Sequence, residues 1–546
     1  MSARKQVFSI APNIQYAVLA LMVALFFISV NVLFRPIFPI DETRYVSVAW
    51  EMWLDNNWLV PHINGATYDH KPPFMFWLFS SIWALFGTSE TVTRMVVPGF
   101  SLINLYLVSK LAQKVYPDSP QAKWLSPLIL ISFLGWFLYS GMIMFDLMLT
   151  VFIQLAVISV WKFAQTDRIF GARLSGVFLG LGMLTKGPVV FVYFIPFIAL
   201  VRLWHPSPSR INKAFFKAIV QSVFIAIAVI LAWAIPAAIA GGAEYAKAIF
   251  WGQSAGRIQD SFAHARPFYW YVMLLPALLF PWFFLTGFWR SRPWLGGERS
   301  DTFCLALFVI VVAIFSCFSG KQIHYLFPVF PFAAIWVANR LSPEKFTTEP
   351  AVIAMLVFVA IAILSSPLWV EKVFRSAQIT EVYQSWALLP VAFMGLLLWK
   401  RPLPFERLAL NLGALMLSLS ALLASLSPIL NNLYDVTDIG RHIHQLQARG
   451  ASVSFVGKYH NTFGYAGRLE APLNLISGSK EQRDAFLSTE PGYTVWIQRK
   501  KTDPLAENSV YMTPFRGKWL FIMDNQMLEK ILQENQTNNL VVAEDS

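Results

Sequence analysis

The sequence predicts an α-helical polytopic membrane protein that ends in a small α/β domain. Hydrophobic residues make up 56% of the 546 residues and charged residues only 14%, whereas soluble domains carry about 25% charged residues. Long apolar runs fill the chain up to about residue 429, and polar residues then appear throughout. We therefore expect a transmembrane domain over 1–429 and a C-terminal domain over 430–546. This composition excludes a disordered chain, a disulfide scaffold and a soluble nucleic-acid binder.

Thirteen apolar runs have about the length and composition of membrane-spanning helices. The first run follows Arg4 and Lys5 and is longer than the core of a signal peptide. No small-residue cleavage site follows it, so we expect an uncleaved first span. The predicted spans are 14–33, 94–113, 124–141, 144–163, 172–186, 189–204, 216–240, 269–289, 301–318, 321–340, 350–370, 383–399 and 407–427.

Lysine and arginine concentrate in alternate connections between these runs. Cationic side chains are enriched in cytoplasmic loops, so the pattern places the N-terminus in the cytoplasm. Thirteen spans then place the C-terminal domain in the periplasm. The net charge of +12 fits these connections better than a nucleic-acid surface. The cationic connections carry Lys110 and Lys114; Lys162, Arg168 and Arg173; Arg202, Arg210, Lys213 and Lys217; Arg290, Arg292 and Arg299; Arg340 and Lys345; and Lys400, Arg401 and Arg407.

The apolar run at 73–87 does not fit this alternation, because a span there would invert every later connection. We expect it to lie on the outer surface or to re-enter the membrane from that side, within the first of two large outer loops, 35–93 and 241–268. In the first loop, apolar residues recur at helical spacing from Asp41 onward, which predicts a helix in the interface plane. Short strands are expected around 452–456, 493–498 and 519–523 of the C-terminal domain.

Ionisable residues occur at three places where the membrane makes them costly. Asp41 and Glu42 follow the first span, Asp146 lies at the outer end of the fourth, and Lys186 lies at the outer end of the fifth. Taken alone, each acidic residue can cap a helix, and Lys186 can extend toward the lipid headgroups. All of them fall on the outer side of the predicted topology. An ionisable residue at membrane depth indicates a functional site, and their convergence favours that interpretation.

Further cations and aromatic residues fall on the same side. Lys71 precedes two prolines, which stiffen the backbone behind its ammonium group. These residues can also be ordinary interfacial anchors or solvated loop charges. A basic pocket on the outer face would bind an anion presented from the outer leaflet, since positive charge is normally biased inward. The other residues of this set are Arg257, His264 and Arg266 in the second loop, and Lys321, His324 and Tyr325 near the tenth span.

Five of these strings, in this order, resemble the aminoarabinose lipid A transferases, which are grouped with the protein O-mannosyltransferases among the GT-C glycosyltransferases. The resemblance covers about 14–340 well and the rest of the layout loosely. The strings are Asp41-Glu-Thr-Arg-Tyr45, Tyr68-x-x-Lys71-Pro-Pro, Asp146 at the start of a span, Leu184-Thr-Lys-Gly-Pro188 and Lys321-x-x-His-Tyr325.

The resemblance implies a GT-C fold and a glycosyltransferase of the bacterial inner membrane with a periplasmic active site. Its donor would be a sugar, aminoarabinose or a related one, linked to undecaprenyl phosphate, and its acceptor lipid A or another molecule of the outer leaflet. Asp41 resembles the family's catalytic aspartate and Asp146 its second functional acidic residue, and we add Glu42 as a third candidate carboxylate. The predicted donor-phosphate ligands are Lys71, Arg266 or Arg257, Tyr325 and Lys186.

A divalent metal such as zinc is the one cofactor that the resemblance raises. Similar enzymes often carry Glu immediately before Lys-Pro-Pro, where it can join a loop histidine around zinc. This chain has His70 at that position and His264 in the second loop. Histidine is a zinc ligand, but two ligands do not make a site, so the metal requirement stays open.

Two other functions are compatible with parts of the sequence. A protein O-mannosyltransferase would use a similar donor and a peptide acceptor. A flippase or transporter of lipid-linked sugars predicts polar residues at many span midplanes and inverted repeats. The ionisable residues of this chain instead concentrate at one surface, which favours the transferase.

Overall fold

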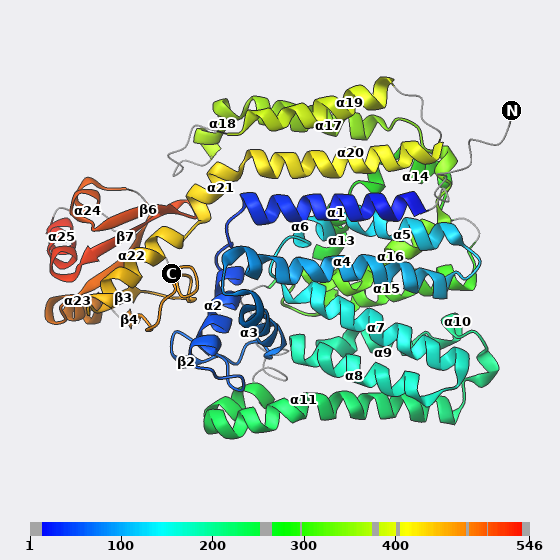
Figure 1. The fold of residues 1–546 in the computed structure, drawn as a ribbon, viewed down its shortest axis with the longest axis horizontal. Coiled ribbons are helices and arrows are strands. Elements are labelled where there is room, and N and C mark those ends of the chain that lie inside the picture. Colours follow the sequence, from blue (N-terminus) through cyan, green and yellow to red (C-terminus); the bar gives the residue numbers. More distant parts are fainter. Residues whose placement is uncertain are drawn as a thin grey trace.

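The computed structural model describes residues 14–251, 265–294, 297–373, 382–399, 404–476, 480–499 and 501–537. Figure 1 shows two parts, a bundle of roughly parallel helices and a sheet-containing domain beyond one end of it. Helix α21 (Ser427–Tyr434) follows α20 (Pro404–Ser425) and leads from the bundle to that domain. The predicted boundary at 429/430 therefore falls inside α21.

The bundle confirms a multi-pass membrane protein. Seven helical stretches among the described residues are long and apolar enough to cross a bilayer. They are Ile14–Phe34 (α1), Glu90–Val115 (α4), Phe145–Thr166 (α7), Ile169–Ala199 (α8 and α9), Lys213–Trp251 (including α11, Lys213–Lys247), Arg299–Cys317 (α15) and Arg407–Ser425 in α20.

The remaining predicted spans also contain helix, but in shorter pieces. Proline accounts for part of this, because it removes a backbone donor and crowds the preceding turn, and it occurs inside α5, α13 and η6. The count of thirteen crossings stays a prediction. The pieces are α5 (Pro120–Ser132), α6 (Leu134–Tyr139), α10 (Val201–Trp204), α13 (Trp270–Leu278), α14 (Thr286–Ser291), η6 (Ile323–Val329), α16 (Phe330–Arg340), α17 (Pro350–Leu364), α18 (Ser366–Val373), η8 (Gln384–Ala387) and α19 (Leu388–Trp399).

Helices α8 (Ile169–Lys186) and α9 (Val190–Ala199) run in opposite directions and coincide with the runs at 172–186 and 189–204. The chain reverses at Gly187, whose φ of +77° favours glycine. Helices α9 and α10 then lead back along α7. As a result, Trp204 lies against Trp161, near the other end of α7, with ring centroids 5.1 Å apart. The reversal leaves Lys186 at the end of the bundle that faces the C-terminal domain.

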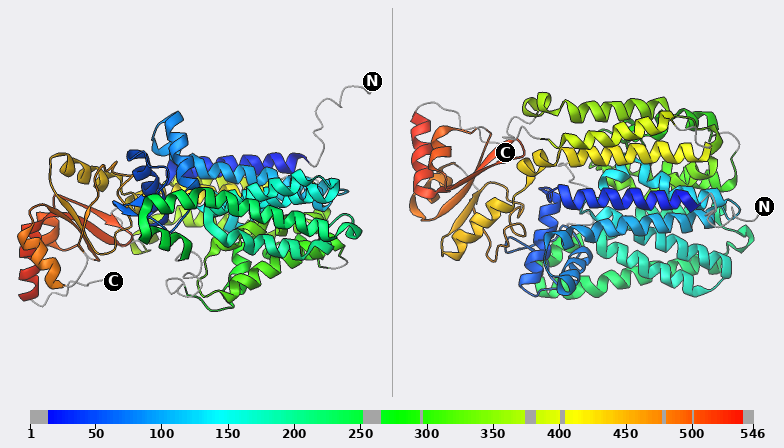
Figure 2. Two further views of the ribbon diagram at one scale, coloured as in Figure 1. Left: turned by 90° about the horizontal axis from the view of Figure 1, so that it is seen from below. Right: turned by 45° about the horizontal axis from the view of Figure 1, so that its top comes forward.

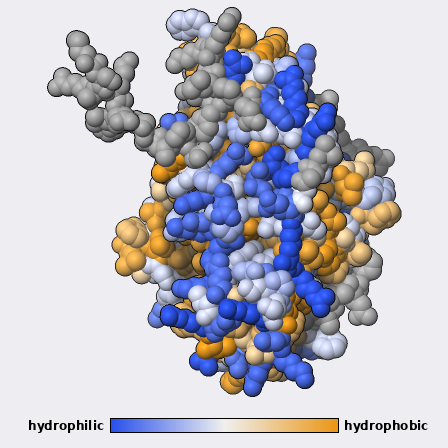
Figure 3. All heavy atoms as spheres, turned by 90° about the vertical axis from the view of Figure 1, so that its right-hand side faces the viewer, coloured by the Kyte–Doolittle hydropathy of each residue, from blue (hydrophilic) through white to orange (hydrophobic). Residues whose placement is uncertain are grey.

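The cationic connections that the structure describes meet at the opposite end of the bundle, whereas Lys400 and Arg401 lie outside the described residues. Their side chains bond across helices there: Lys114 donates to Gln165 at 3.2 Å, and Arg210 pairs with Asp167 at 2.7 Å. Figure 3 views this end and shows a hydrophilic band flanked by apolar surface on both sides. The arrangement agrees with a single cytoplasmic surface carrying the positive charges.

The first outer loop forms α2 (Asp41–Leu54), the hairpin β1 (His62–Ile63) and β2 (Ala66–Thr67), and α3 (Phe74–Phe86). Figures 1 and 2 show α2 and α3 at the end of the bundle next to the C-terminal domain. The 13 residues of α3 reach only about 20 Å, which is less than the hydrocarbon thickness of about 30 Å. The helix predicted from Asp41 onward is present as α2, whereas its orientation in the membrane interface and the outer position of 73–87 stay predictions.

The C-terminal domain is a five-stranded sheet in the order β4-β3-β5-β7-β6, with helices on both faces. Side chains alternate along each strand, so Val495 and Ile522 pack on one face with α22, while Trp496 and Phe521 pack on the other with α25. The three predicted strands correspond to β3, β5 and β7. The elements are α22 (Thr437–Ala448), β3 (Val453–Val456), β4 (Asn474–Ile476), α23 (Lys480–Thr489), β5 (Tyr493–Gln498), α24 (Asp503–Asn508), β6 (Tyr511–Phe515), β7 (Lys518–Asp524) and α25 (Asn525–Thr537).

The segment 459–473 between β3 and β4 fastens the C-terminal domain to α2, α3 and α4. Its backbone amide at Tyr465 donates to Ser47 Oγ at 2.9 Å, and its carbonyl at Leu469 accepts from Trp50 Nε1 at 2.9 Å. The Tyr465 ring stacks on Trp83 at 5.4 Å. We call 459–473 the docking segment.

Asn64, at the tip of the β1–β2 hairpin, makes two reciprocal bonds with the docking segment. Its Nδ2 donates to Leu473 O and its Oδ1 accepts from Leu473 N, both at 2.9 Å. Asn64→Gly removes both bonds but tolerates the local φ of +51°. We expect a loss of about 1–3 kcal/mol, measured as faster hydrogen exchange across 461–473. Asn56→Gly is the control, since Asn56 is also left-handed (φ +48°) but bonds only within its own loop. Equal exchange in the two variants would contradict this role.

Candidate active site

The first turn of α2 presents Asp41 to solvent, with 55% of its side chain exposed. A carboxylate in the first turn interacts favourably with the helix dipole. Its partner is Arg44, one turn further along, whose guanidinium also lies over the Tyr45 ring at 5.3 Å. Asp41 is therefore held by one cation at an accessible position.

Asp146 and Lys186 form a buried ion pair at the same end of the bundle, with Nζ 2.5 Å from Oδ1. Asp146 lies in the first turn of α7 and Lys186 in the last turn of α8, so each charge opposes the partial charge of its own helix end. Two neighbours from η6 complete the group. His324 Nε2 lies 3.7 Å from Asp146 Oδ2, and the Tyr325 ring centroid lies 4.7 Å from Lys186 Nζ.

Phe145 joins these two groups. Its ring contacts Tyr45 at 4.8 Å, and Lys71 Nζ lies 6.0 Å from its centroid. Phe145 directly precedes Asp146, so these two ring contacts connect α2 and Lys71 to the Asp146–Lys186 pair. The structure therefore brings together five predicted site residues from four distant segments: Asp41, Lys71, Asp146, Lys186 and Tyr325.

This cluster favours an anionic ligand. Lys71, Lys186 and Arg44 supply three cations against the two carboxylates of Asp41 and Asp146. Because such charges interact more strongly near a low-dielectric bundle than in water, a phosphate there would be attracted by these three cations.

Glu42 does not share the exposure of Asp41. Its carboxylate is 1% exposed and pairs with Arg35 through both oxygens, at 2.5 and 3.1 Å. The same oxygens accept from the backbone amides of Phe38 and Ile143, each at 2.7 Å. The Glu42 carboxylate thus accepts four hydrogen bonds. These bonds connect α2 to the end of α1 and to the segment before α7, which is a structural role.

Arg266, one of the two predicted arginines, is exposed, and the contacts of its backbone tie it to the start of η6. Its amide donates to Ser319 O at 3.1 Å, and its carbonyl accepts from Lys321 Nζ at 3.0 Å. This places Arg266 in a loop beside the segment that carries Tyr325. Arg257 and His264 lie outside the described residues, so the choice between the arginines stays open.

The described residues offer a metal ion too few ligands. His70 is 57% exposed and lies 3.7 Å from Asp69. No group of three or more His, Cys, Asp or Glu side chains in the part of the chain that the structure describes could hold a metal. The two-histidine arrangement predicted from His70 and His264 remains a prediction.

Two residues of the site were not predicted. Arg44 could have been found, because it follows Asp41 by three residues and therefore lies on the same face of the helix. His460 carried no signal in the sequence. It comes from the docking segment, where burial and the nearby cation Arg44 lower its pKa, and Asp41 opposes that shift. The C-terminal domain thus contributes an imidazole on which the charges of Arg44 and Asp41 act.

The fold is that of a polytopic membrane protein, and a solved structure shares it. ArnT from Cupriavidus metallidurans bound to undecaprenyl phosphate superposes with a TM-score of 0.72, covering 94% of this chain and 98% of that chain at 18% identity. The apo form of the same protein gives a TM-score of 0.71 at 17% identity.

Sequence relatives confirm the resemblance to the aminoarabinose transferases. The chain is 28% identical over 298 residues to undecaprenyl phosphate-alpha-4-amino-4-deoxy-L-arabinose arabinosyl transferase 1 of Pseudomonas fluorescens Pf0-1, covering 53% of this chain and 51% of that protein. It is 26% identical over 381 residues to the enzyme of Pseudomonas paraeruginosa PA7, covering 66% and 67%. The chain thus spans about half to two thirds of the length of these relatives. A family model described as dolichyl-phosphate-mannose-protein mannosyltransferase matches residues 70–233.

Proposed function

We propose that this protein is an inner-membrane glycosyltransferase that moves a sugar from undecaprenyl phosphate to lipid A. The observation that carries the proposal is the convergence of Asp41, Lys71 and the Asp146–Lys186 pair at the outer end of the bundle. The names of the similar proteins support undecaprenyl phosphate as the lipid carrier and aminoarabinose as the sugar.

The leaving phosphate needs the cations. As the bond between the anomeric carbon and the phosphate oxygen breaks, its electron pair stays on that oxygen, and positive charge grows on the sugar. Lys71, with Lys186 behind it, would stabilise the phosphate in a site where fixed charges act more strongly than in water. The Asp146 carboxylate holds Lys186 in place through its 2.5 Å contact.

Asp41 is the group placed to act on the acceptor. If the acceptor is a hydroxyl, its oxygen bonds to the anomeric carbon and its proton passes to Asp41 as general base. If it is a phosphate, no proton has to leave, and Asp41 would orient the sugar and balance the growing positive charge. The partner Arg44 keeps the carboxylate oriented in either case.

The location follows from the same proposal. We place the protein in the bacterial inner membrane, with the N-terminus in the cytoplasm and the site and C-terminal domain in the periplasm. A cysteine introduced at Asp55, at the end of α2, would then be labelled by an impermeant reagent from the periplasm.

Lys71→Met should slow transfer by about 10²-fold or more, because a lost charge at the leaving group removes transition-state stabilisation. The assay contains purified protein, undecaprenyl-phosphate-linked aminoarabinose and lipid A, with mass spectrometry of the lipid product. Lys110→Met is the matched control, since Lys110 is exposed at the opposite end of the bundle. A wild-type enzyme that leaves lipid A unmodified would refute the acceptor, and a Lys71→Met enzyme as fast as the control would refute the role of Lys71.

The mannosyltransferase model that matches 70–233 supports a second candidate, a protein O-glycosyltransferase. The two differ only in the acceptor. Offering the purified enzyme lipid A and a serine-rich peptide together, with one donor, separates them by the molecule whose mass increases.

A further inference from the structure

A cavity of about 240 Å³ lies between the C-terminal domain and the bundle. It is on the other side of α2 from Asp41. Successive helix residues are about 100° apart, so Asp41 and Arg44 share one face of α2, while Thr43 points away from them. Thr43 lines the cavity, and the neighbouring Ser47 bonds to the docking segment. The cavity is therefore separate from the candidate active site.

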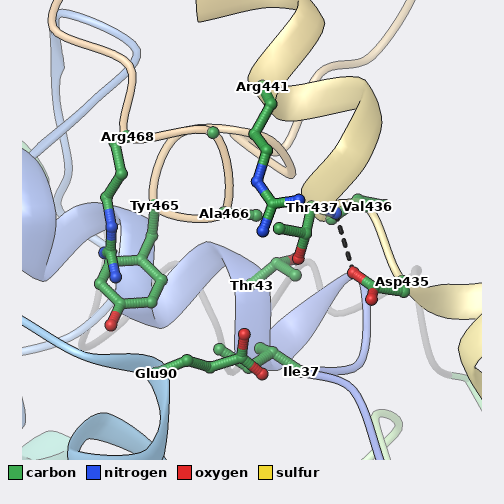
Figure 4. Close-up of a pocket in the computed structure, with 11 residues that line it drawn as sticks. Ile37, Thr43, Glu90, Asp435, Val436, Thr437, Arg441, Tyr465, Ala466 and Arg468 are labelled. Atoms are coloured by element: carbon green, nitrogen blue, oxygen red, sulfur yellow. Dashed lines mark hydrogen bonds between the residues drawn. The ribbon is translucent and has the colours of Figure 1, made fainter.

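Four charged side chains line this cavity (Figure 4). Arg441 of α22 and Arg468 of the docking segment reach down from the C-terminal domain, and Glu90 of α4 lies on the opposite wall. Asp435 lies at the side, where one oxygen accepts from the amide of Thr437 at 2.8 Å. Two guanidinium groups and two carboxylates thus face one small space.

The contacts of Arg468 fix its guanidinium at the wall of this cavity. Its guanidinium lies over the Tyr465 ring at 3.7 Å, and one terminal nitrogen donates to Thr88 O at 2.5 Å. The other terminal nitrogen is buried and has no hydrogen-bond partner. That nitrogen is closed off from the cavity, so Arg468 would act on a ligand through the positive charge of its guanidinium.

The other charged groups are available to a ligand. Arg441 pairs with Asp438 at 2.8 Å, but both side chains are about two-thirds exposed. The side chain of Glu90 is 43% exposed, and its contact with Arg94 is 3.3 Å. Exposed ion pairs contribute little stability, so both groups can exchange part of these contacts for a ligand.

The cavity lies at the depth of lipid headgroups. Ile37 lines it three residues after the end of α1, and Glu90 is the first residue of the α4 span. The ends of spanning helices mark the edge of the hydrocarbon layer. Leu85, Phe86 and Met95, close to Glu90 in the chain, are exposed and apolar, so acyl chains can lie beside the cavity.

We propose that this cavity binds a membrane phospholipid whose headgroup carries both a phosphate and a primary ammonium. The two arginines would hold the phosphate, for which the planar guanidinium is well shaped. Glu90 and Asp435 would accept hydrogen bonds from the ammonium. A purely anionic headgroup would meet these two carboxylates as like charges, and a quaternary ammonium has no N–H to donate to them.

The consequence is a lipid that bridges the two parts of the protein. Its phosphate would contact the C-terminal domain and its ammonium the start of α4. This second lipid would not react, and its role is independent of the sugar transfer proposed above.

The test is native mass spectrometry of the full-length protein with phosphatidylethanolamine, phosphatidylcholine and phosphatidylglycerol of identical acyl chains. We expect phosphatidylethanolamine to be retained at least about fivefold better than either competitor, as one or two net hydrogen bonds would give. Arg441→Gln should lower this retention. Glu90→Gln should remove the preference over phosphatidylglycerol.

Arg449→Gln is the matched control, because Arg449 is exposed just beyond the end of α22 and does not line the cavity. Arg468 is left intact, since its contacts with Thr88 and Tyr465 hold the docking segment. Equal retention of the three lipids would overturn the proposal, as would unchanged selectivity in both cavity variants. Better retention of phosphatidylglycerol, or displacement of phosphatidylethanolamine by millimolar inorganic phosphate, would overturn it in favour of a simple anion site.

Discussion

Asp41→Asn is expected to lower the transfer rate by about 10²- to 10⁴-fold, the usual contribution of a general base. The amide keeps the size of the side chain but can neither take a proton nor offset positive charge on the sugar. Since Asp41 is accessible and paired only with Arg44 across one helical turn, the fold should tolerate the change. Initial rates with lipid-linked sugar and lipid A, with the protein's thermal midpoint measured in parallel, check both statements.

Asp55→Asn is the control for this substitution, because Asp55 follows the other end of α2 and is exposed. It should leave both the rate and the midpoint unchanged. An Asp41→Asn enzyme that turns over within about threefold of wild type would exclude Asp41 as base or charge-balancing group.

Glu42→Gln is expected to act on stability instead, costing about 3–5 kcal/mol, as breaking a buried ion pair does. The new amide nitrogen would face the donors of Arg35, Phe38 and Ile143, which now bond to carboxylate oxygens. Arg35 would also lose its buried counter-charge. The thermal midpoint in detergent should fall sharply, whereas Asp41→Asn should barely change it.

A second variant distinguishes a structural from a catalytic Glu42. Arg35→Met combined with Glu42→Met removes both charges, so part of the lost stability should return, together with transfer activity in proportion to the folded fraction. A Glu42→Gln protein with a normal midpoint and no turnover would instead support the catalytic role predicted from the sequence.

Hydropathy predicted the environment of the site well. The placement of Lys186 and Asp146 at one end of the bundle was predicted by counting apolar runs, and the reversal at Gly187 and the Asp146–Lys186 contact agree with it. The helix from Asp41 was likewise predicted from local spacing. These features depend on residues that are close together in the sequence, so hydropathy and helical spacing are enough to predict them.

Pairings between distant residues were beyond the sequence. Lys186 meets Asp146 across 40 positions, and η6 adds His324 to the pair. The docking segment brings His460 to α2 from more than 400 residues away. Such contacts depend on how the helices pack, and no local periodicity encodes them.

The sequence by itself determined that this chain is a membrane protein whose costly ionisable side chains gather at one end of the spans. Both properties follow from the composition and order of residues within each apolar run and its neighbouring connections. Only the tertiary structure decided between the adjacent carboxylates Asp41 and Glu42. The two residues are adjacent in the chain. Arg35 and the amide of Ile143 enclose the carboxylate of Glu42, whereas the carboxylate of Asp41 is open to solvent. The physical reason is that burial of a charge depends on groups brought together by the fold.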